Sequence, residues 1–267
     1  MAADISTWLK PEVKAEGLKQ EGGIFVYMDN DFVSGDNHKY MKMYDWMSYV
    51  YDFGEKWIGR LKYGGAIDQL RSQLMSRLEW RNNISVLYVS IGTGADLNHL
   101  PQGVDLRTLE LVGADISLGM LKRCKKKWQK KTNLTLVQCP AEQLPFADNT
   151  FDAVTVAYGV RNFEDLDCGL REMLRVLKPG GRLVIIELTS PVHFPMKQLF
   201  WLYAHVWMPL VGKLISRDSR AYSYLPATME AFPQGEVMQG IIEKAGFQSV
   251  KFRRFTFGLS TLYTAEK

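Results

Sequence analysis

Two features near the middle of this 267-residue chain could do chemistry together, a glycine turn and a single carboxylate. The turn reads SIGTGAD at residues 90–96 and follows an apolar run. Its glycines let the backbone approach a ligand closely, and the N-terminus of a helix after it would favour negative charge. Asp115 ends the next apolar run, 21 residues after Gly94, where its two oxygens can accept both hydroxyls of a ribose. Taken alone, the turn could also be a tight connection, and Asp115 could cap a helix beginning near Ser117.

A regular alternation of apolar runs and helical patterns must position these residues. Short continuous apolar runs separated by helices are typical of parallel strands buried on both faces. The chain therefore predicts an α/β fold with a doubly wound, mostly parallel sheet and an antiparallel C-terminal edge. In such sheets, ligands bind outside the carboxyl ends of the strands. The expected strands are residues 86–91, 109–114, 134–139, 151–157, 182–188, 249–255 and 259–266, with helices at 117–130, 165–177 and 234–245.

The remaining segments suggest how the chain is organised. Residues 1–40 have weak periodicity and are expected to form an N-terminal extension wrapping onto the core. Residues 41–267 are expected to form a single domain, and two helices are expected between residues 40 and 78, broken near Gly64-Gly65. A helical insertion at about residues 192–233 would cover the substrate site.

Composition excludes several other classes of protein. A net charge of +4 does not by itself indicate nucleic-acid binding, which needs basic residues concentrated on one face. The four histidines lack metal-ligand spacing, so no metal is expected. Three cysteines without a CxxC motif fit a reducing cytoplasm. Residues 194–215 are too interrupted by charges and prolines to span a membrane, although contact with a membrane surface stays open, as does an oligomeric state.

Three further motifs distinguish among nucleotide-binding enzymes. They are AEQLPF at residues 141–146, NTFD at 149–152 and LRVLKPGG at 174–181. In sequence, order and spacing they resemble class I methyltransferases, which implies S-adenosylmethionine as the cofactor. The cofactor-binding residues implied by this resemblance are Ser90, Gly92, Thr93, Gly94, Asp115, Ile116, Met120, Ala141, Glu142 and Tyr158.

A second set of motifs indicates a narrower resemblance. YGVRNF at residues 158–163, ELTSP at 187–191, YSYLP at 222–226 and AFPQGE at 231–236 resemble the ubiquinone/menaquinone biosynthesis C-methyltransferases. This resemblance covers roughly residues 40–267. It implies carbon methylation of a quinol or phenol-type apolar acceptor.

The narrower resemblance also implies catalytic residues. Arg161 would stabilise a phenolate, because a guanidinium stays protonated and is a poor base. Asn162 would orient the ring oxygen, and Tyr44 or a water would relay the proton. Arg161 could instead form a structural ion pair with Asp165 or Glu187. The aromatic residues expected to wall an apolar substrate pocket are Tyr222, Tyr224 and Phe232.

The chain departs from the family pattern around the cofactor. Tyr88 stands where the glycine motif usually opens with an acid, and Ser90-Ile91 replaces a pair of small residues. Cys139-Pro140 stands where a polar residue is common, and a proline lacks a donor N–H. These departures keep two alternatives open: a methyltransferase for another small molecule or lipid, and a non-catalytic relative that binds the cofactor or a partner.

One charged segment has two interpretations. The helix expected at residues 117–130 carries a run of basic side chains. It could be an ordinary solvated face, or it could contact anionic lipid headgroups where a prenylated substrate resides. The basic residues are Lys122, Arg123, Lys125, Lys126, Lys127, Lys130 and Lys131.

Overall fold

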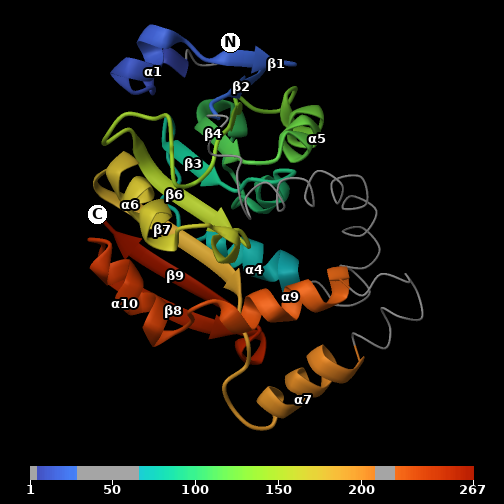
Figure 1. Ribbon diagram of the computed structural model, residues 1–267. Helices are drawn as coiled ribbons and strands as arrows, with labels where there is room; N and C mark the ends of the chain where they lie inside the picture. The colour runs from blue at the N-terminus through green and yellow to red at the C-terminus, as the bar shows by residue number, and fades with distance from the viewer. Residues whose placement is uncertain (1–4, 29–65, 208–219) are drawn as a thin grey trace.

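A computed structural model describes residues 5–28, 66–207 and 220–267, except for the side chains of residue 66 and residues 220–225. In this part of the chain, helices cover both faces of one nine-stranded sheet, as Figure 1 shows. The order of the strands across the sheet is β1-β2-β5-β4-β3-β6-β7-β9-β8. Neighbours from β2 to β7 run parallel, whereas β1, β9 and β8 pair antiparallel. The predicted fold class is therefore confirmed.

The strands follow the apolar runs of the sequence closely. Their bounds are β1 Lys19–Glu21, β2 Ile24–Val26, β3 Ser85–Val89, β4 Glu110–Asp115, β5 Thr135–Gln138, β6 Phe151–Ala157, β7 Leu177–Leu188, β8 Gln248–Phe255 and β9 Ser260–Glu266. Adjacent residues of β3 point into two different cores: Val86 and Tyr88 into one, Leu87 and Val89 into the other. Because both faces are covered, every residue of β3 is buried, and the strand reads as a continuous apolar run.

The helices divide between the two faces of the sheet. Helices α4 and α5 contribute to the core that contains Tyr88, and α1, α6 and α10 contribute to the core that contains Leu87. Their bounds are α1 Pro11–Glu16, α4 Ala66–Met75, α5 Leu118–Trp128, α6 Leu166–Val176, α7 Met196–Leu202, α9 Arg220–Ala231 and α10 Glu236–Lys244. Helix α4 matches the second of the two helices expected before residue 78, and the first lies outside the described residues.

Three local expectations differ from the structure. The N-terminal segment adds two strands, with β2 parallel to β5, because the backbone groups along the edge of β5 are available for pairing. The glycine turn leads into a 3-10 helix at Ala95–His99 and not an α-helix. The strand expected at residues 182–188 begins earlier, at Leu177, and residues 178–181 form a bulge inside β7, where the register against β6 shifts between Phe151 and Ala153.

Within the described residues, no helix is both long enough and apolar enough to cross a membrane.

Candidate active site

A cavity opens at the carboxyl ends of β3, β4 and β6, at the point where the strand order changes direction, as expected for a doubly wound sheet. Nine of the ten predicted cofactor residues line it. They are Ser90, Gly92, Thr93, Asp115, Ile116, Met120, Ala141, Glu142 and Tyr158. The same cavity includes residues that were not predicted, among them Arg71, Asp96 and Phe163.

Asp115 joins the glycine turn to the start of α5. One carboxylate oxygen accepts the backbone N–H of Gly92 at 2.8 Å, and the other accepts that of Ser117 at 2.9 Å. The helix is capped by Ser117, whose Oγ accepts the N–H of Met120 at 3.1 Å, so the alternative that Asp115 is the cap is wrong. A carboxylate has about four acceptor positions, so these two bonds leave capacity for the hydroxyls of a ribose.

The glycine turn is built from backbone conformations of the left-handed region. Ser90, Gly92 and Gly94 have φ values of 56°, 57° and 71°. Gly94 does not line the cavity; a Cβ there would lie 2.7 Å from Nε1 of Trp128 and 2.8 Å from Sγ of Cys124. Gly94 therefore allows α5 to pack against the turn. Its predicted role as a cofactor contact stays a prediction.

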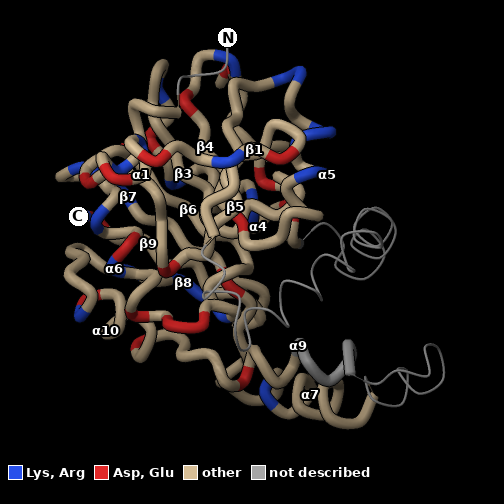
Figure 2. The backbone as a smooth tube through the Cα atoms, turned by 45° about the horizontal axis from the view of Figure 1, so that its top comes forward, with Lys and Arg blue, Asp and Glu red and all other residues tan. Residues whose placement is uncertain are grey.

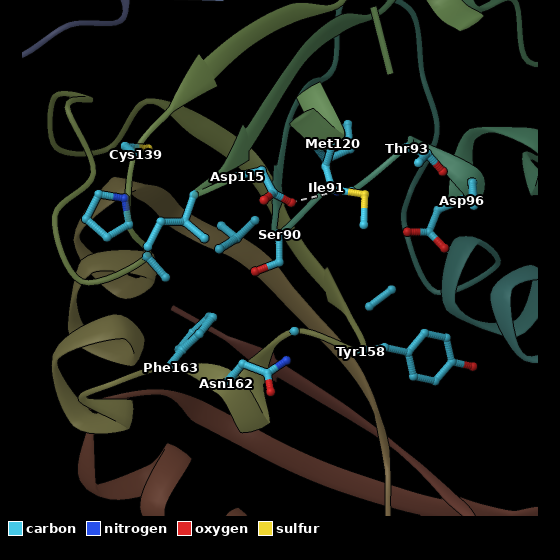
Figure 3. A pocket seen from close by; sticks show the side chains of 18 of the residues that line it. Ser90, Ile91, Thr93, Asp96, Asp115, Met120, Cys139, Tyr158, Asn162 and Phe163 are labelled. Carbon is cyan, nitrogen blue, oxygen red and sulfur yellow. Dashed lines mark hydrogen bonds between the residues drawn. The ribbon is translucent and has the colours of Figure 1, made fainter. Parts of the chain in front are cut away.

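At one end of the cavity lie the apolar side chains of Cys139 and Phe163 (Figure 3), and the lining also includes Ile116 and Pro140. In Figure 3, Phe163 and Cys139 lie to one side of Asp115. Glu142 lines this end, but its Oε1 accepts the backbone N–H groups of Glu164 at 2.7 Å and Asp165 at 3.3 Å. Burial raises the pKa of Glu142, and these backbone bonds oppose the shift. Glu142 thus helps to hold the loop that presents Phe163.

The opposite end of the cavity is polar. Arg71, from α4, and Asp96, from the 3-10 helix, form an ion pair with 3.0 Å between Nε and Oδ1. Their side chains are only 8% and 9% exposed. The Arg71 guanidinium lies 5.9 Å from the ring centroid of Tyr158. Sequence reasoning missed this pair, although Asp96 is the last residue of the SIGTGAD turn and its carboxylate could have indicated a charged group there.

Arg161 and Asn162 have different surroundings. Asn162 lines the cavity, whereas Arg161 does not. Arg161 forms an ion pair with the fully buried Glu187, and its Nη1 also donates to the backbone oxygen of Tyr158 at 2.7 Å. The backbone N–H of Arg161 donates to Glu187 Oε2 at 3.1 Å. Of the two ion-pair partners considered for Arg161, Glu187 is thus the one that the structure pairs with it.

Of the aromatic residues predicted at the acceptor site, only Phe232 has a described side chain. Tyr44 lies outside the described residues, and the side chains of Tyr222 and Tyr224, on α9, do as well. Phe232 is 6% exposed and belongs to the hydrophobic core with Met238. It follows α9 directly and packs inward, and its predicted place in the substrate pocket stays a prediction.

The cavity suits an adenosine-based cofactor that carries an amino acid. Its apolar end can take a base, and Asp115 lies near its middle, where a carboxylate can take the ribose. Its other end holds charged groups. Among the described residues, no group of three or more His, Cys, Asp or Glu side chains could hold a metal ion. The fold and this site together define a class I S-adenosylmethionine-dependent methyltransferase.

Comparisons with known proteins identify the family. The model of the ubiE/COQ5 methyltransferase family matches residues 28–267. A demethylmenaquinone methyltransferase of Bacteroides fragilis is 54% identical over 166 residues, which cover 61% of this chain and 68% of that protein. The ubiquinone/menaquinone biosynthesis C-methyltransferase UbiE of Shewanella woodyi is 36% identical over 243 residues, covering 89% and 91%. The chain belongs to the ubiE/COQ5 methyltransferase family and is an S-adenosylmethionine-dependent enzyme.

Solved structures support the fold. The [4+2]-cyclase SpnF aligns with a TM-score of 0.65 at 18% identity, covering 86% of this chain and 96% of the cyclase. A methyltransferase of Thermotoga maritima aligns with a TM-score of 0.57 at 17% identity, covering 83% and 98%. At such low identity the likeness concerns the fold alone, since one fold can carry different reactions.

Proposed function

We propose that this enzyme methylates a ring carbon of a quinol of the demethylmenaquinone type. The observation that carries the proposal is the 158–163 turn, which presents Asn162 to the cavity and holds Arg161 against Glu187 immediately beside it. Family membership, with relatives named for this activity, supports the choice of acceptor. The alternatives are another apolar acceptor and a cofactor-binding protein without activity.

The cofactor supplies a methyl group that is already activated by its positively charged sulfur. The protein therefore needs mainly to align an electron-rich ring carbon with that methyl and to exclude water. A quinol carbon becomes more nucleophilic when the adjacent hydroxyl loses its proton. Carbon methylation also releases the proton of the methylated carbon, so the ring regains its aromaticity.

Asn162 is the cavity-lining side chain that we propose holds the acceptor oxygen. Its amide can donate to a phenolate and accept from a phenol, which suits both protonation states. Arg161 does not line the cavity, and its guanidinium forms an ion pair with Glu187. Because Arg161 also binds the Tyr158 carbonyl, it fixes the shape of the turn as well. Arg161 is thus a positioning residue, and Asn162 is the proposed contact.

Methyl transfer to defined acceptors tests this function. Wild type with labelled cofactor should methylate a short-chain demethylmenaquinol, and NMR of the product should place the new methyl on carbon. An Asn162→Ala variant should lose about 100-fold or more in kcat, a typical effect of removing one well-placed polar group, while it binds S-adenosylhomocysteine as wild type does. Methylation of oxygen, or turnover only with unrelated acceptors, would contradict the proposal. Cofactor binding without any transfer would favour the non-catalytic alternative.

We also infer that the enzyme contacts a membrane surface through the apolar segment Met196–Trp207, which comprises α7 and a π-helical turn. Four of its aromatic and aliphatic side chains are more than half exposed: Leu199 at 54%, Trp201 at 56%, Leu202 at 52% and Trp207 at 62%. Lys197 is its only Lys or Arg, and the tube in Figure 2 is mostly tan along α7. Tryptophan and tyrosine favour the interface between lipid and water, and a prenylated quinol would reside there.

The basic helix α5 is a poorer candidate for the same contact. It lies at the opposite end of the molecule from α7, in Figure 1 and in Figure 2. Two of its lysines are also engaged within the protein, because Lys122 pairs with Glu21 and Lys125 donates to the carbonyl of Gly22. One flat membrane surface would therefore meet α7 or α5, and we favour α7.

Vesicle flotation distinguishes the two surfaces. A Trp201→Ser, Trp207→Ser double variant should lose most binding to phosphatidylcholine vesicles, because it removes two exposed aromatic anchors. A Lys126→Ser, Lys130→Ser variant on α5 is the matched control and should bind as wild type does. Binding that requires anionic lipid and fails only in the α5 variant would overturn this inference.

A further inference from the structure

The apolar segment Met196–Trp207 buries little of its own surface. Ala204, in its π-helical turn, is 4% exposed and is the only buried residue of the segment. The segment follows the carboxyl end of β7, and the cavity opens at the same edge of the sheet. An element with few buried apolar side chains can shift at a low cost in free energy while the rest of the fold stays intact.

Helix α9 lies between this segment and the body of the protein. Figure 1 and Figure 2 both show α9 between α7 and the end of the sheet, and the π-helical turn packs against it. Oε2 of Glu230, on α9, lies 3.6 Å from Nε2 of His205 in the π-helical turn. Nδ1 of His205 lies 3.1 Å from the backbone oxygen of Trp201, and the two rings stack with their centroids 5.1 Å apart. One histidine therefore connects an exposed tryptophan to α9.

Helix α9 also packs against a turn of the active site. It contacts the 3-10 turn Val160–Asn162, in which Val160 is 1% exposed and Asn162 lines the cavity. Met229 precedes Glu230 on the helix and is only 5% exposed, so the helix has a buried contact next to its contact with the π-helical turn. A helix moves largely as one body, so a displacement of the segment at one contact is passed to the other.

We infer that α9 couples the membrane contact to the active site, so that a lipid surface increases the rate of methyl transfer. Lipid would bury the exposed apolar side chains of Met196–Trp207 and hold the segment in one position. The segment would then hold α9 against the Val160–Asn162 turn, which shifts the population towards the arrangement that presents Asn162. The inference rests on the proposed membrane contact and does not depend on which acceptor is methylated.

The kcat for an acceptor without a prenyl chain tests the inference. At a saturating concentration, a tail-less naphthoquinol gains nothing from being concentrated in lipid, so a change in kcat reports on the enzyme itself. Phosphatidylcholine vesicles should raise the kcat of wild type about fivefold or more, which is the lower end of typical coupling between two sites. The Trp201→Ser, Trp207→Ser variant should show no such rise, because it does not bind the vesicles.

An Ala204→Gln, Glu230→Gln variant removes the link and keeps the exposed anchors. It places a longer polar side chain in the buried contact and removes the charge that faces His205. This variant should float with vesicles and bind S-adenosylhomocysteine in their absence as wild type does, but its kcat should not rise. Glu21→Gln is the matched control and should be activated as wild type is, because Glu21 forms an exposed ion pair with Lys122 at the opposite end of the molecule.

Binding gives a second readout that needs no turnover. Coupling between two sites is reciprocal, so saturating S-adenosylhomocysteine should tighten the binding of wild type to vesicles about twofold or more, but not that of the Ala204→Gln, Glu230→Gln variant. A protein that fails to methylate the naphthoquinol can still be tested in this way, which separates a wrong acceptor from a wrong inference. Flotation with an unchanged kcat, or an equal rise in the Ala204→Gln, Glu230→Gln variant, would overturn the inference and leave the membrane contact standing. Failure of wild type to float would overturn both.

Discussion

Replacing Asp152 with asparagine should cost this protein roughly 2 kcal/mol of folding free energy at neutral pH. Asp152 belongs to the NTFD motif but does not line the cavity. Its Oδ2 accepts from the backbone N–H of Ser85 at 2.9 Å, the Oγ of Ser85 at 2.7 Å and Nζ of Lys178 at 3.0 Å. Oδ1 accepts from Arg81 at 2.9 Å. One carboxylate thus links the starts of β3 and β6 to the bulge of β7.

The magnitude follows from the pKa. Burial would raise the pKa of Asp152, but the hydrogen bonds from Ser85 and Lys178 outweigh it and lower the pKa from 3.8 to about 2. Each pKa unit corresponds to about 1.4 kcal/mol, so the ionised form contributes roughly 2 kcal/mol. Because the folded pKa is depressed, the contribution is complete above about pH 4 and is lost as the pH falls towards 2. In a chain of this size, the melting temperature should fall by about 5 °C.

Urea denaturation followed by circular dichroism measures the difference in the free energy of unfolding between wild type and the Asp152→Asn variant at several pH values. The difference should be constant from pH 7 to pH 5 and should shrink below pH 4. Asp148→Asn, in the loop before β6, is the matched control, because Asp148 is 68% exposed and its surface pair with Arg175 should contribute less than about 1 kcal/mol. A difference that disappears between pH 7 and pH 5, or an Asp152→Asn variant as stable as wild type, would refute the reasoning.

Two further predictions concern packing. Gly94→Ala should lower the free energy of unfolding, measured in urea, by roughly 2–3 kcal/mol, because the φ of Gly94 is 71° and a Cβ would lie 2.8 Å from Cys124 Sγ. Gly240→Ala is the control, because Gly240 lies inside α10 with open space around it. This variant should be neutral or more stable by up to about 1 kcal/mol. A thiol-specific disulfide reagent should modify Cys168 in the native protein, but Cys124 and Cys139 only after unfolding. Cys124 and Cys139 are buried, and burial raises the pKa of each thiol, to about 12 for Cys124. Mass spectrometry of the digested protein checks the order of modification, and rapid native labelling of Cys139 would contradict it.

Residues that act within their own segment were predictable from the sequence. The apolar runs identified the central strands, because a strand buried on both faces holds mainly apolar residues. Asp115 was placed at the cavity because a residue that ends a parallel strand must lie at the carboxyl edge of the sheet. The motifs at residues 141–146 and 158–163 likewise marked loops at that edge. Enzyme class, cofactor and family were all confirmed.

The tertiary structure decided which distant residues meet. Arg71 pairs with Asp96, 25 positions away, and Arg161 pairs with Glu187, 26 positions away. The tertiary structure also packs Gly94 against α5 and Phe232 into the core. Local periodicity and turn chemistry depend on neighbours in the chain, so they specify elements and their ends. A side chain's partner depends on how helices and strands pack together, and no local pattern carries that information.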